Sequence, residues 1–336
     1  MPKPHIAVAC CADENYVIGL TMAMVSCFAQ ASGHYHYKLY VIDCGLAASS
    51  ITALEQKLAH TALLNGASYE LAVIKPPTDT IASLPEHLGS WITYARFLLA
   101  DMIDESHVVY LDSDILCLRG VEDFIVHQTG AEAIVGVRDP IGTIKHDCPC
   151  PEQLQLPDDP YLNAGLLLLN LDWMRCNLPL TKVLQWVSDI GLEHLTHADQ
   201  TIINMVCQGH KTVIEKSNNW VLETVNASQL AGALPKVNIH YINRPKPWQP
   251  HQSEPRKYLA NKLFIEAANH YQIAELAAIE INPKAWRKAK RKALFYRLFN
   301  PKRAIVYQAI VAAVDYASTA ERLLSKQDLY SNMQQP

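Results

Sequence analysis

The sequence lacks the features that mark several common classes of protein. The turn Gly-x-Gly-x-x-Gly is absent, which argues against a dinucleotide-dependent dehydrogenase. None of the nine cysteines forms a Cys-x-x-Cys pair, so we expect reduced, mostly buried thiols and a cytoplasmic protein. We also expect no secretory signal, because Met1 to His5 leads directly into a short apolar run. The apolar stretch 304–313 is too short to span a bilayer.

Charged residues are scarce and unevenly distributed. Only 18% of the 336 residues are charged and 49% are apolar, as in a folded globular protein. The formal net charge is −4, yet 284–303 holds nine basic residues and no acidic one, interleaved with aromatic and leucine side chains. This pattern predicts a basic amphipathic helix at the surface of an anionic membrane, with a solvated basic helix as the alternative. The acidic remainder of the chain disfavours nucleic acid, and we expect no such partner.

Short apolar runs alternate with helical patterns along the first two thirds of the chain. Such alternation predicts right-handed βαβ units and an α/β fold whose ligands bind beyond the carboxyl ends of the strands. The predicted strands are 5–12, 37–44, 68–75, 108–111, 132–139, 166–171 and 211–216. The predicted helices include 49–60, 90–104 and 201–207.

The stretch 108–116 is the most informative, because an apolar run there ends in two carboxylates. Residues 108–111 are typical of a buried strand, and Asp112 and Asp114 follow. Residues two apart on a strand share a face, so both carboxylates can converge on one cation. Carboxylate oxygens suit Mn²⁺ or Mg²⁺, which keep open positions for phosphate oxygens. Two solvated loop aspartates are the alternative for an isolated Asp-x-Asp.

Further polar residues lie near the ends of predicted elements. Arg96 lies off the apolar face of the 90–104 helix, where it could reach a phosphate or a carboxylate of the site, or remain a surface arginine. Asp199 near a helix start is favoured by the helix dipole alone. His240 at a strand end is either a metal ligand or a satisfied core histidine. The long loop 140–160 is typical of a site cover or a binding loop.

Six motifs follow one another between about residues 5 and 248. They are ADENY at 12–16, TYARFLLADMI at 93–103, YLDSD at 110–114, YLNAGLLLLNL at 161–171, ADQTIIN at 198–204 and HY…KPW at 240–248. In this order the chain resembles the retaining nucleotide-sugar glycosyltransferases of family 8, which include glycogenin and bacterial lipopolysaccharide galactosyl- and glucosyltransferases. The resemblance implies a GT-A fold over 1–255, with one Rossmann-like mixed central sheet flanked by helices. A basic, helical C-terminal region would occupy 256–336.

The same resemblance implies a site for Mn²⁺ (or Mg²⁺) and a UDP-sugar. The metal ligands would be Asp112, Asp114 and His240. The donor would be held by Ala12, Asp13, Asn15, Tyr16, Arg96, Asp112, Ser113, Asn163, Ala164 and Lys246. The reacting centre would contain Gln200, Asp199 and Asp139. The chain departs from the family at 242–245, where a Gly-containing turn is usual; Arg244 would supply a replacement charge there.

The implied activity is transfer of galactose or glucose to a glycan or glycolipid acceptor, such as a lipopolysaccharide or lipooligosaccharide core, at the cytoplasmic face of the inner membrane. The resemblance puts the amide of Gln200 near the expected nucleophile position, with Asp199 beside it. We therefore favour front-face transfer, in which the leaving phosphate helps deprotonate the acceptor, over a glycosyl-enzyme. The alternatives are a haloacid-dehalogenase-type Mg²⁺-dependent phosphatase, whose Asp-x-Asp lies near its domain start, and a non-catalytic UDP-sugar-binding module.

Overall fold

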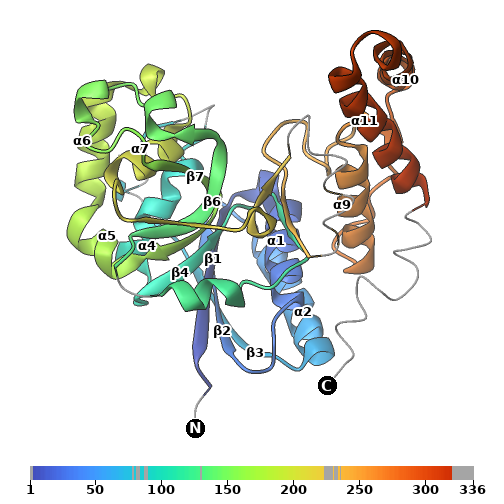
Figure 1. The fold of residues 1–336 in the computed structure, drawn as a ribbon. Coiled ribbons are helices and arrows are strands. Elements are labelled where there is room, and N and C mark those ends of the chain that lie inside the picture. Colours follow the sequence, from blue (N-terminus) through green and yellow to red (C-terminus); the bar gives the residue numbers. More distant parts are fainter. Residues whose placement is uncertain are drawn as a thin grey trace.

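A seven-stranded mixed sheet forms the centre of the molecule (Figure 1). The computed structural model describes residues 3–77, 79–80, 84–86, 90–128, 131–222, 230, 234 and 236–319. In the order β3-β2-β1-β4-β7-β6-β8, every neighbouring pair is parallel except those that β7 makes with β4 and β6. The strands are β1 (His5–Ala12), β2 (His36–Asp43), β3 (Ser68–Ile74), β4 (His107–Leu111), β6 (Ile134–Thr143), β7 (Pro160–Asn170) and β8 (Lys211–Ile214). The predicted mixed α/β sheet is confirmed.

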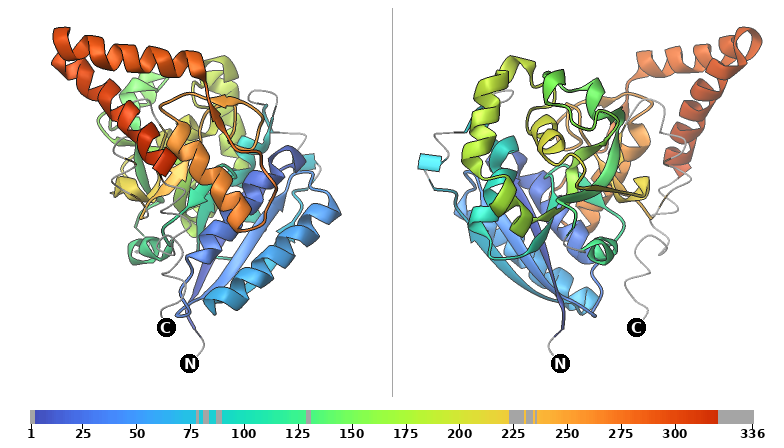
Figure 2. Two further views of the ribbon diagram at one scale, coloured as in Figure 1. Left: turned by 90° about the vertical axis from the view of Figure 1, so that its right-hand side faces the viewer. Right: turned by 60° about the vertical axis from the view of Figure 1, so that its left-hand side comes forward.

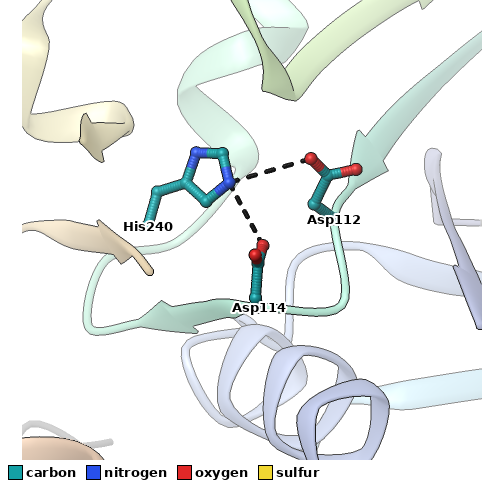
Figure 3. A group of neighbouring side chains, drawn as sticks. All are labelled: Asp112, Asp114 and His240. Carbon is teal, nitrogen blue, oxygen red and sulfur yellow. Dashed lines mark ion pairs between the residues drawn. The ribbon is translucent and has the colours of Figure 1, made fainter. Parts of the chain in front are cut away.

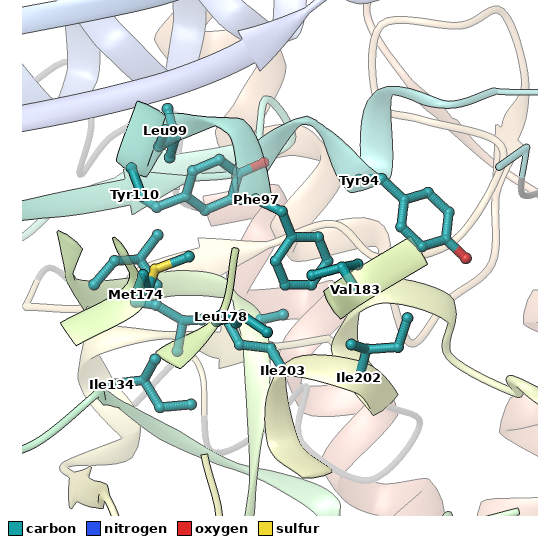
Figure 4. Packing of buried hydrophobic residues seen from close by; sticks show 14 of the residues in the cluster. Tyr94, Phe97, Leu99, Tyr110, Ile134, Met174, Leu178, Val183, Ile202 and Ile203 are labelled. Carbon is teal, nitrogen blue, oxygen red and sulfur yellow. The ribbon is translucent and has the colours of Figure 1, made fainter. Parts of the chain in front are cut away.

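Helices cover both faces of this sheet because its strands are apolar on both sides. In β4, Val109 and Leu111 join the core beneath α1 and α2, whereas Val108 and Tyr110 join the core beneath α5 to α7. Figure 4 shows the second of these cores, where Phe97 and Tyr110 lie among side chains of the covering helices. The helices are α1 (Val17–Ala29), α2 (Ala48–Asn65), α4 (Leu99–Met102), α5 (Leu171–Asn177), α6 (Leu180–Ile190) and α7 (Ala198–Val206).

The predicted helix over 90–104 is wrong in type. The chain forms a 3-10 helix, η2 (Ile92–Leu98), followed only by the four-residue α4. Three residues per turn bring Thr93 and Arg96 onto one edge of η2, from which both reach Asp199. Five consecutive residues, 94–98, are buried, so Arg96 is not a surface arginine. The remaining 3-10 helices are η1 (Glu14–Tyr16), η3 (Glu122–His127), η4 (Ile144–His146), η5 (Pro151–Gln153), η6 (Leu192–His194) and η7 (Lys216–Asn218).

A smaller sheet begins just after β4 and brings residues that are far apart in the sequence to the edge of the central sheet where β4 ends. It contains β5 (Ile115–Cys117), β10 (Asn238–His240) and β9 (Trp220–Val221). Its antiparallel register places His240 opposite Ile115, next to Asp114. The Asp-x-Asp turn therefore joins the two sheets, and His240 lies beside it in space although it is far away in sequence.

The described part of the C-terminal region, up to residue 319, is mainly helical, as predicted, and residues 320–336 lie outside the described residues. Helix α9 (Tyr258–His270) packs on the body, where Leu263 and Phe264 share a core with Met22 and Ile239. Helices α10 (Pro283–Phe299) and α11 (Pro301–Thr319) contact each other and project from the body (Figure 2). The short strands β11 (Gln252–Ser253) and β12 (Glu280–Ile281) flank α9 along the chain. Within the described residues, the length and apolarity needed to cross a membrane are not combined in one helix.

Candidate active site

Two adjoining cavities open at the edge where β1 and β4 end. The first, of about 790 Å³, collects residues that the motifs singled out on the donor side: Ala12, Asp13, Asn15, Tyr16, Arg96, Asp112, Ser113, Asp114 and Lys246. The second, of about 540 Å³, collects those of the predicted reacting centre: Asp139, Asn163, Ala164, Asp199, Gln200 and His240. Asp112, Asp114, Arg96 and Thr93 line both cavities, so the structure brings all the sequence-predicted site residues together around the Asp-x-Asp turn.

The carboxylates of Asp112 and Asp114 and the imidazole of His240 converge on one point (Figure 3). His240 Nε2 lies 3.1 Å from Asp114 Oδ1 and 3.7 Å from Asp112 Oδ2. One ligand atom from each residue lies within 4.8 Å of the other two. Two carboxylates and one imidazole form a donor set for a divalent cation such as Mn²⁺.

Asn163 determines which nitrogen of His240 faces the carboxylates. Its amide orientation is set because Nδ2 donates to Asp139 at 2.9 Å while Oδ1 accepts from the Gly165 and Asn219 nitrogens at 3.1 and 2.8 Å. This Oδ1 lies 3.1 Å from His240 Nδ1, and an amide oxygen only accepts, so we assign the ring proton to Nδ1. Nε2 then turns toward Asp112 and Asp114, which requires a positive charge between them, either a proton or a bound cation.

Space for the His240 ring is reserved by Gly165. A Cβ at position 165 would lie 2.1 Å from His240 Cε1, so any side chain there would displace the imidazole. Asp114 Oδ1 is buried and makes no hydrogen bond, which leaves its lone pairs for a cation. The residues present therefore fit a divalent metal ion.

Lys246 is the second positive partner of Asp114. Its Nζ donates to Asp114 Oδ2 at 2.6 Å and to the Tyr241 carbonyl at 2.7 Å, and it is buried. Burial raises the pKa of Asp114, but His240 and Lys246 outweigh that effect and hold it well below the ordinary range. Asp114 is thus ionised at neutral pH.

Arg96 lies between the carboxylates of Asp112 and Asp199 and contacts both. Its Nη2 lies 2.9 Å from Asp112 Oδ1 and its Nε lies 2.8 Å from Asp199 Oδ2, and a third nitrogen donates to the Ala164 carbonyl. Burial alone would lower the pKa of Arg96, yet Asp199, Tyr110 and Asp112 raise it above its usual value. For Asp199, burial raises the pKa in spite of Arg96 and the Thr93 hydroxyl. The guanidinium therefore carries a permanent charge between the buried carboxylate of Asp199 and the partly exposed one of Asp112.

In the second cavity, the side-chain amides of Gln200 and Asn163 both donate hydrogen bonds to the carboxylate of Asp139. Gln200 Oε1 accepts from the Ala164 N–H at 2.9 Å, and its Nε2 donates to Asp139 at 3.3 Å. Asp139 also accepts from Asn163 and from the Ile141 N–H at 3.1 Å. The sequence predicted Asp139 at a strand end; it lies inside β6, where the pairing with β7 is irregular.

Sequence reasoning missed several residues that support the site. Tyr110 donates to Asp112 at 2.8 Å and its ring lies 4.5 Å beneath the Arg96 guanidinium. Thr93 bonds Asp199, and Asn219 bonds Asn163. The three-residue spacing of Thr93 and Arg96 was a signal that Thr93 could reach Asp199 beside Arg96. No local pattern in the sequence marks Asn219.

The fold and the strand-end carboxylates narrow the class of protein, and comparison with known proteins gives the family. Residues 7–252 match the family described as Glycosyl transferase family 8, so the chain belongs to it. This membership leaves nothing in favour of the phosphatase alternative.

Two curated relatives illustrate the similarity. A probable glycosyl transferase Gly of Streptococcus gordonii is 25% identical over 218 residues, which are 63% of this chain and 29% of that protein. A lipopolysaccharide 1,3-galactosyltransferase of Salmonella typhimurium is 24% identical over 234 residues, which are 64% of this chain and 66% of that enzyme. The match therefore spans less than two thirds of the length of each relative.

Solved structures show the same fold. The galactosyltransferase LgtC, determined with donor and acceptor sugar analogs, gives a TM-score of 0.62 at 22% identity and covers 84% of this chain and 99% of its own. The glycosyltransferase GlyE of Streptococcus pneumoniae gives 0.57 at 19% identity, with 78% and 60% covered. The predicted GT-A fold is confirmed.

Proposed function

We propose that the protein is a retaining hexosyltransferase that moves galactose or glucose from a UDP-sugar to a glycan or glycolipid acceptor. One observation carries this proposal: Asp112, Asp114 and His240 converge at the junction of two cavities. A Mn²⁺ (or Mg²⁺) ion held by these residues would neutralise the charge that develops on the departing diphosphate.

The first cavity is proposed to bind the nucleotide. Asp13, Asn15 and Tyr16 follow β1 and would hold uracil and ribose, together with Ala12 and Ser113. The Tyr16 ring is fixed by an edge-on contact with Trp248 at 5.7 Å. Lys246 and Arg244 line the same cavity and would face the diphosphate. Arg244 would supply a positive charge at 242–245, where the family usually has a Gly-containing turn.

The second cavity is proposed to hold the hexose and the reacting centre. Arg96, Asn163, Ala164 and Asp139 would grip the sugar, and Gln200 and Asp199 would flank the anomeric carbon. Oδ1 of Asp199 accepts from the Thr93 hydroxyl and Oδ2 is ion-paired with Arg96 at 2.8 Å, and both contacts lower the nucleophilicity of the carboxylate. This supports front-face transfer over a glycosyl adduct on Asp199.

The acceptor is proposed to be a surface glycan, and the basic helices are proposed to bring the enzyme to it. The relative from Salmonella typhimurium is named a lipopolysaccharide 1,3-galactosyltransferase. On α10, Lys284, Arg287, Lys288, Arg291 and Lys292 line one hollow with Phe295. Phe295 and Phe299 are exposed nearby by 55% and 70%. We infer that the basic helices of 256–336 attach to the cytoplasmic face of an anionic inner membrane, whereas α9, the first helix of that region, packs on the catalytic domain proposed over 1–255.

The test is release of UDP by the purified full chain from a panel of UDP-sugars, with Mn²⁺, with Mg²⁺ or with EDTA. We expect one hexose donor to give metal-dependent release that Asp114→Asn abolishes. A matched control is Asp172→Asn, which removes an exposed ion pair with Arg175 far from the cavities. Failure to bind or turn over any UDP-sugar would overturn the proposal, and metal-dependent binding without turnover in the presence of acceptors would favour the binding module.

A further inference from the structure

A histidine that the family motifs leave unassigned lies on the wall of the second cavity, and a buried aspartate lies behind it. His197 lines this cavity, two residues before Asp199, and its Nδ1 lies 2.9 Å from Asp147 Oδ1. The histidine side chain is 43% exposed, whereas the side chain of Asp147 is only 3% exposed. The pair thus has a buried carboxylate behind an accessible imidazole.

Asp147 is held rigidly by groups other than the histidine. Its Oδ2 accepts from the Tyr161 hydroxyl at 2.6 Å and from the Thr201 hydroxyl at 2.6 Å. These donors come from β7 and α7, while Asp147 itself follows η4 in the connection between β6 and β7, which is 144–159 and not 140–160 as the sequence predicted. Burial raises the pKa of Asp147, but bonds from His197, Thr201 and Tyr161 lower it overall, so the carboxylate is ionised.

The hydrogen bond with Asp147 determines the tautomer of His197. A carboxylate only accepts, so Nδ1 carries the proton that bonds Asp147 and Nε2 is the remaining acceptor. The hydrogen bond from Asp147 raises the pKa of His197, with smaller contributions from Asp139 and Asp199, which makes Nε2 a stronger acceptor. A hydroxyl group is a suitable partner for such a nitrogen.

The surroundings indicate the kind of molecule that brings the hydroxyl. Pro140, Ile141, Val221 and Ile242 give the second cavity apolar surface, on which the carbon face of a sugar ring can lie. Asp139 has only neutral N–H donors among its described bonds, so an anionic ligand would be repelled there. The first cavity, where the nucleotide is proposed to bind, does not include His197 among its lining residues.

We propose that His197, oriented by Asp147, binds a hydroxyl of the acceptor, and that the acceptor group entering this cavity is a neutral hexose. This proposal rests on the proposed function and adds the acceptor side of the site. His197 is the residue that would touch the acceptor; Asp147 is a positioning residue that acts through it.

The test separates acceptor binding from donor chemistry. Methyl β-galactoside, methyl β-glucoside and lactose serve as acceptor probes at increasing concentration, and hydrolysis of the UDP-sugar without a probe reports on the donor side. We expect His197→Ala to raise the KM of the productive probe about tenfold, as for loss of one buried hydrogen bond, while hydrolysis and the donor KM change less than about twofold. His197→Gln, which retains an acceptor atom, should recover part of the loss.

The matched control is His194→Ala, which removes an exposed histidine beside Glu193 on the preceding turn. It should leave the probe KM unchanged. The inference is overturned if His197→Ala keeps the wild-type probe KM, or if donor hydrolysis falls in parallel. It is also overturned if the wild-type protein hydrolyses its donor but transfers to none of the neutral probes. Absence of UDP release from the wild-type protein would instead contradict the proposed function itself.

Discussion

The side-chain amide of Asn163 fixes the tautomer of His240, because its oxygen faces Nδ1 at 3.1 Å and its nitrogen is occupied by Asp139. The proton on Nδ1 leaves Nε2 as the nitrogen that can bind the metal ion. Groups that orient a ligand in this way typically affect metal affinity nearly as strongly as the ligand does.

We predict that Asn163→Ala weakens Mn²⁺ binding about 10- to 100-fold, because His240 loses its orienting partner. Electron paramagnetic resonance of free Mn²⁺ measures this directly, without activity. Asn177→Ala is the control, since Asn177 is an exposed amide that bonds only the Trp173 carbonyl in α5. Unchanged affinity in Asn163→Ala would show that the amide does not orient the ligand.

Metal addition should stabilise the folded protein. A ligand that binds the native state raises the free energy of unfolding, by about 2.7 kcal/mol at a concentration 100 times its dissociation constant. We expect Mn²⁺ to raise the melting temperature of the wild-type protein and to have no effect on Asp112→Asn or His240→Ala. Scanning calorimetry with and without EDTA makes the measurement. An equal rise in these variants would place the ion elsewhere.

Arg96→Lys should reduce both stability and activity. A lysine cannot bond Asp112, Asp199 and the Ala164 carbonyl together, so one desolvated carboxylate loses its partner, at a cost of about 3–5 kcal/mol. Urea unfolding gives the loss. Arg119→Lys, in a partly exposed pair with Asp123, is the matched control and should cost less than about 1 kcal/mol. Similar losses for the two variants would contradict this reading of Arg96.

A pH-dependent contribution to stability is expected from Glu105, at the opposite edge of the sheet. Burial opposes its ionisation, but Lys38, His5 and Tyr40 lower its pKa overall. A lowered pKa means that its stabilising effect is complete above the unfolded value of about 4.3 and is lost as the pH falls below it. Glu105→Gln should therefore be destabilised at pH 7 and approach the wild-type protein at acidic pH.

The control for this experiment is Glu70→Gln, whose exposed carboxylate lies 3.9 Å from the same lysine. Thermal unfolding followed across the pH range compares the two variants. A difference between Glu105→Gln and the wild-type protein that stays constant with pH would show that the loss is one of packing rather than charge.

Membrane binding is predicted to require both charge and aromatic side chains of α10. Flotation with vesicles containing phosphatidylserine should recover the wild-type chain, more weakly at high salt, and neutral vesicles should not. Phe295→Ser with Phe299→Ser should reduce flotation without changing donor hydrolysis. Leu63→Ser, at an exposed leucine on α2, serves as the control. Flotation that persists in the double variant would assign the contact to charge alone.

The central sheet and the Asp-x-Asp turn could be predicted because their signals are local. Apolar runs mark β1, β2 and β4, and the two carboxylates directly follow the last of them. The start of β7 was missed, since Asn163 and Gly165 interrupt the apolar pattern of residues 160–165; in the structure Pro160 and Leu162 pair with Thr143 and Arg138 of β6. Periodicity likewise could not separate the 3-10 helix η2 from an α-helix.

The contacts that orient the site could not be predicted, because they join residues far apart in the sequence. Thr93 and Asp199 are 106 residues apart, Asn163 and Asn219 are 56 apart, and Asp147 and His197 are 50 apart. Each member alone is an ordinary polar residue. The partners meet only when the strands pair into the sheets and α7 packs against the central one.

The reversed direction of β7 has a consequence for how such a site can diversify. Because β7 runs against β4, its beginning rather than its end lies at the ligand-binding edge, and Asn163 and Ala164 reach the cavities from there. The segment that precedes this strand, 144–159, supplies Asp147 behind His197 on the wall of the second cavity, and it lies outside the pairing of the central strands. Changes of length or sequence in that segment can alter which acceptor is chosen while the donor machinery on β1 and β4 stays untouched.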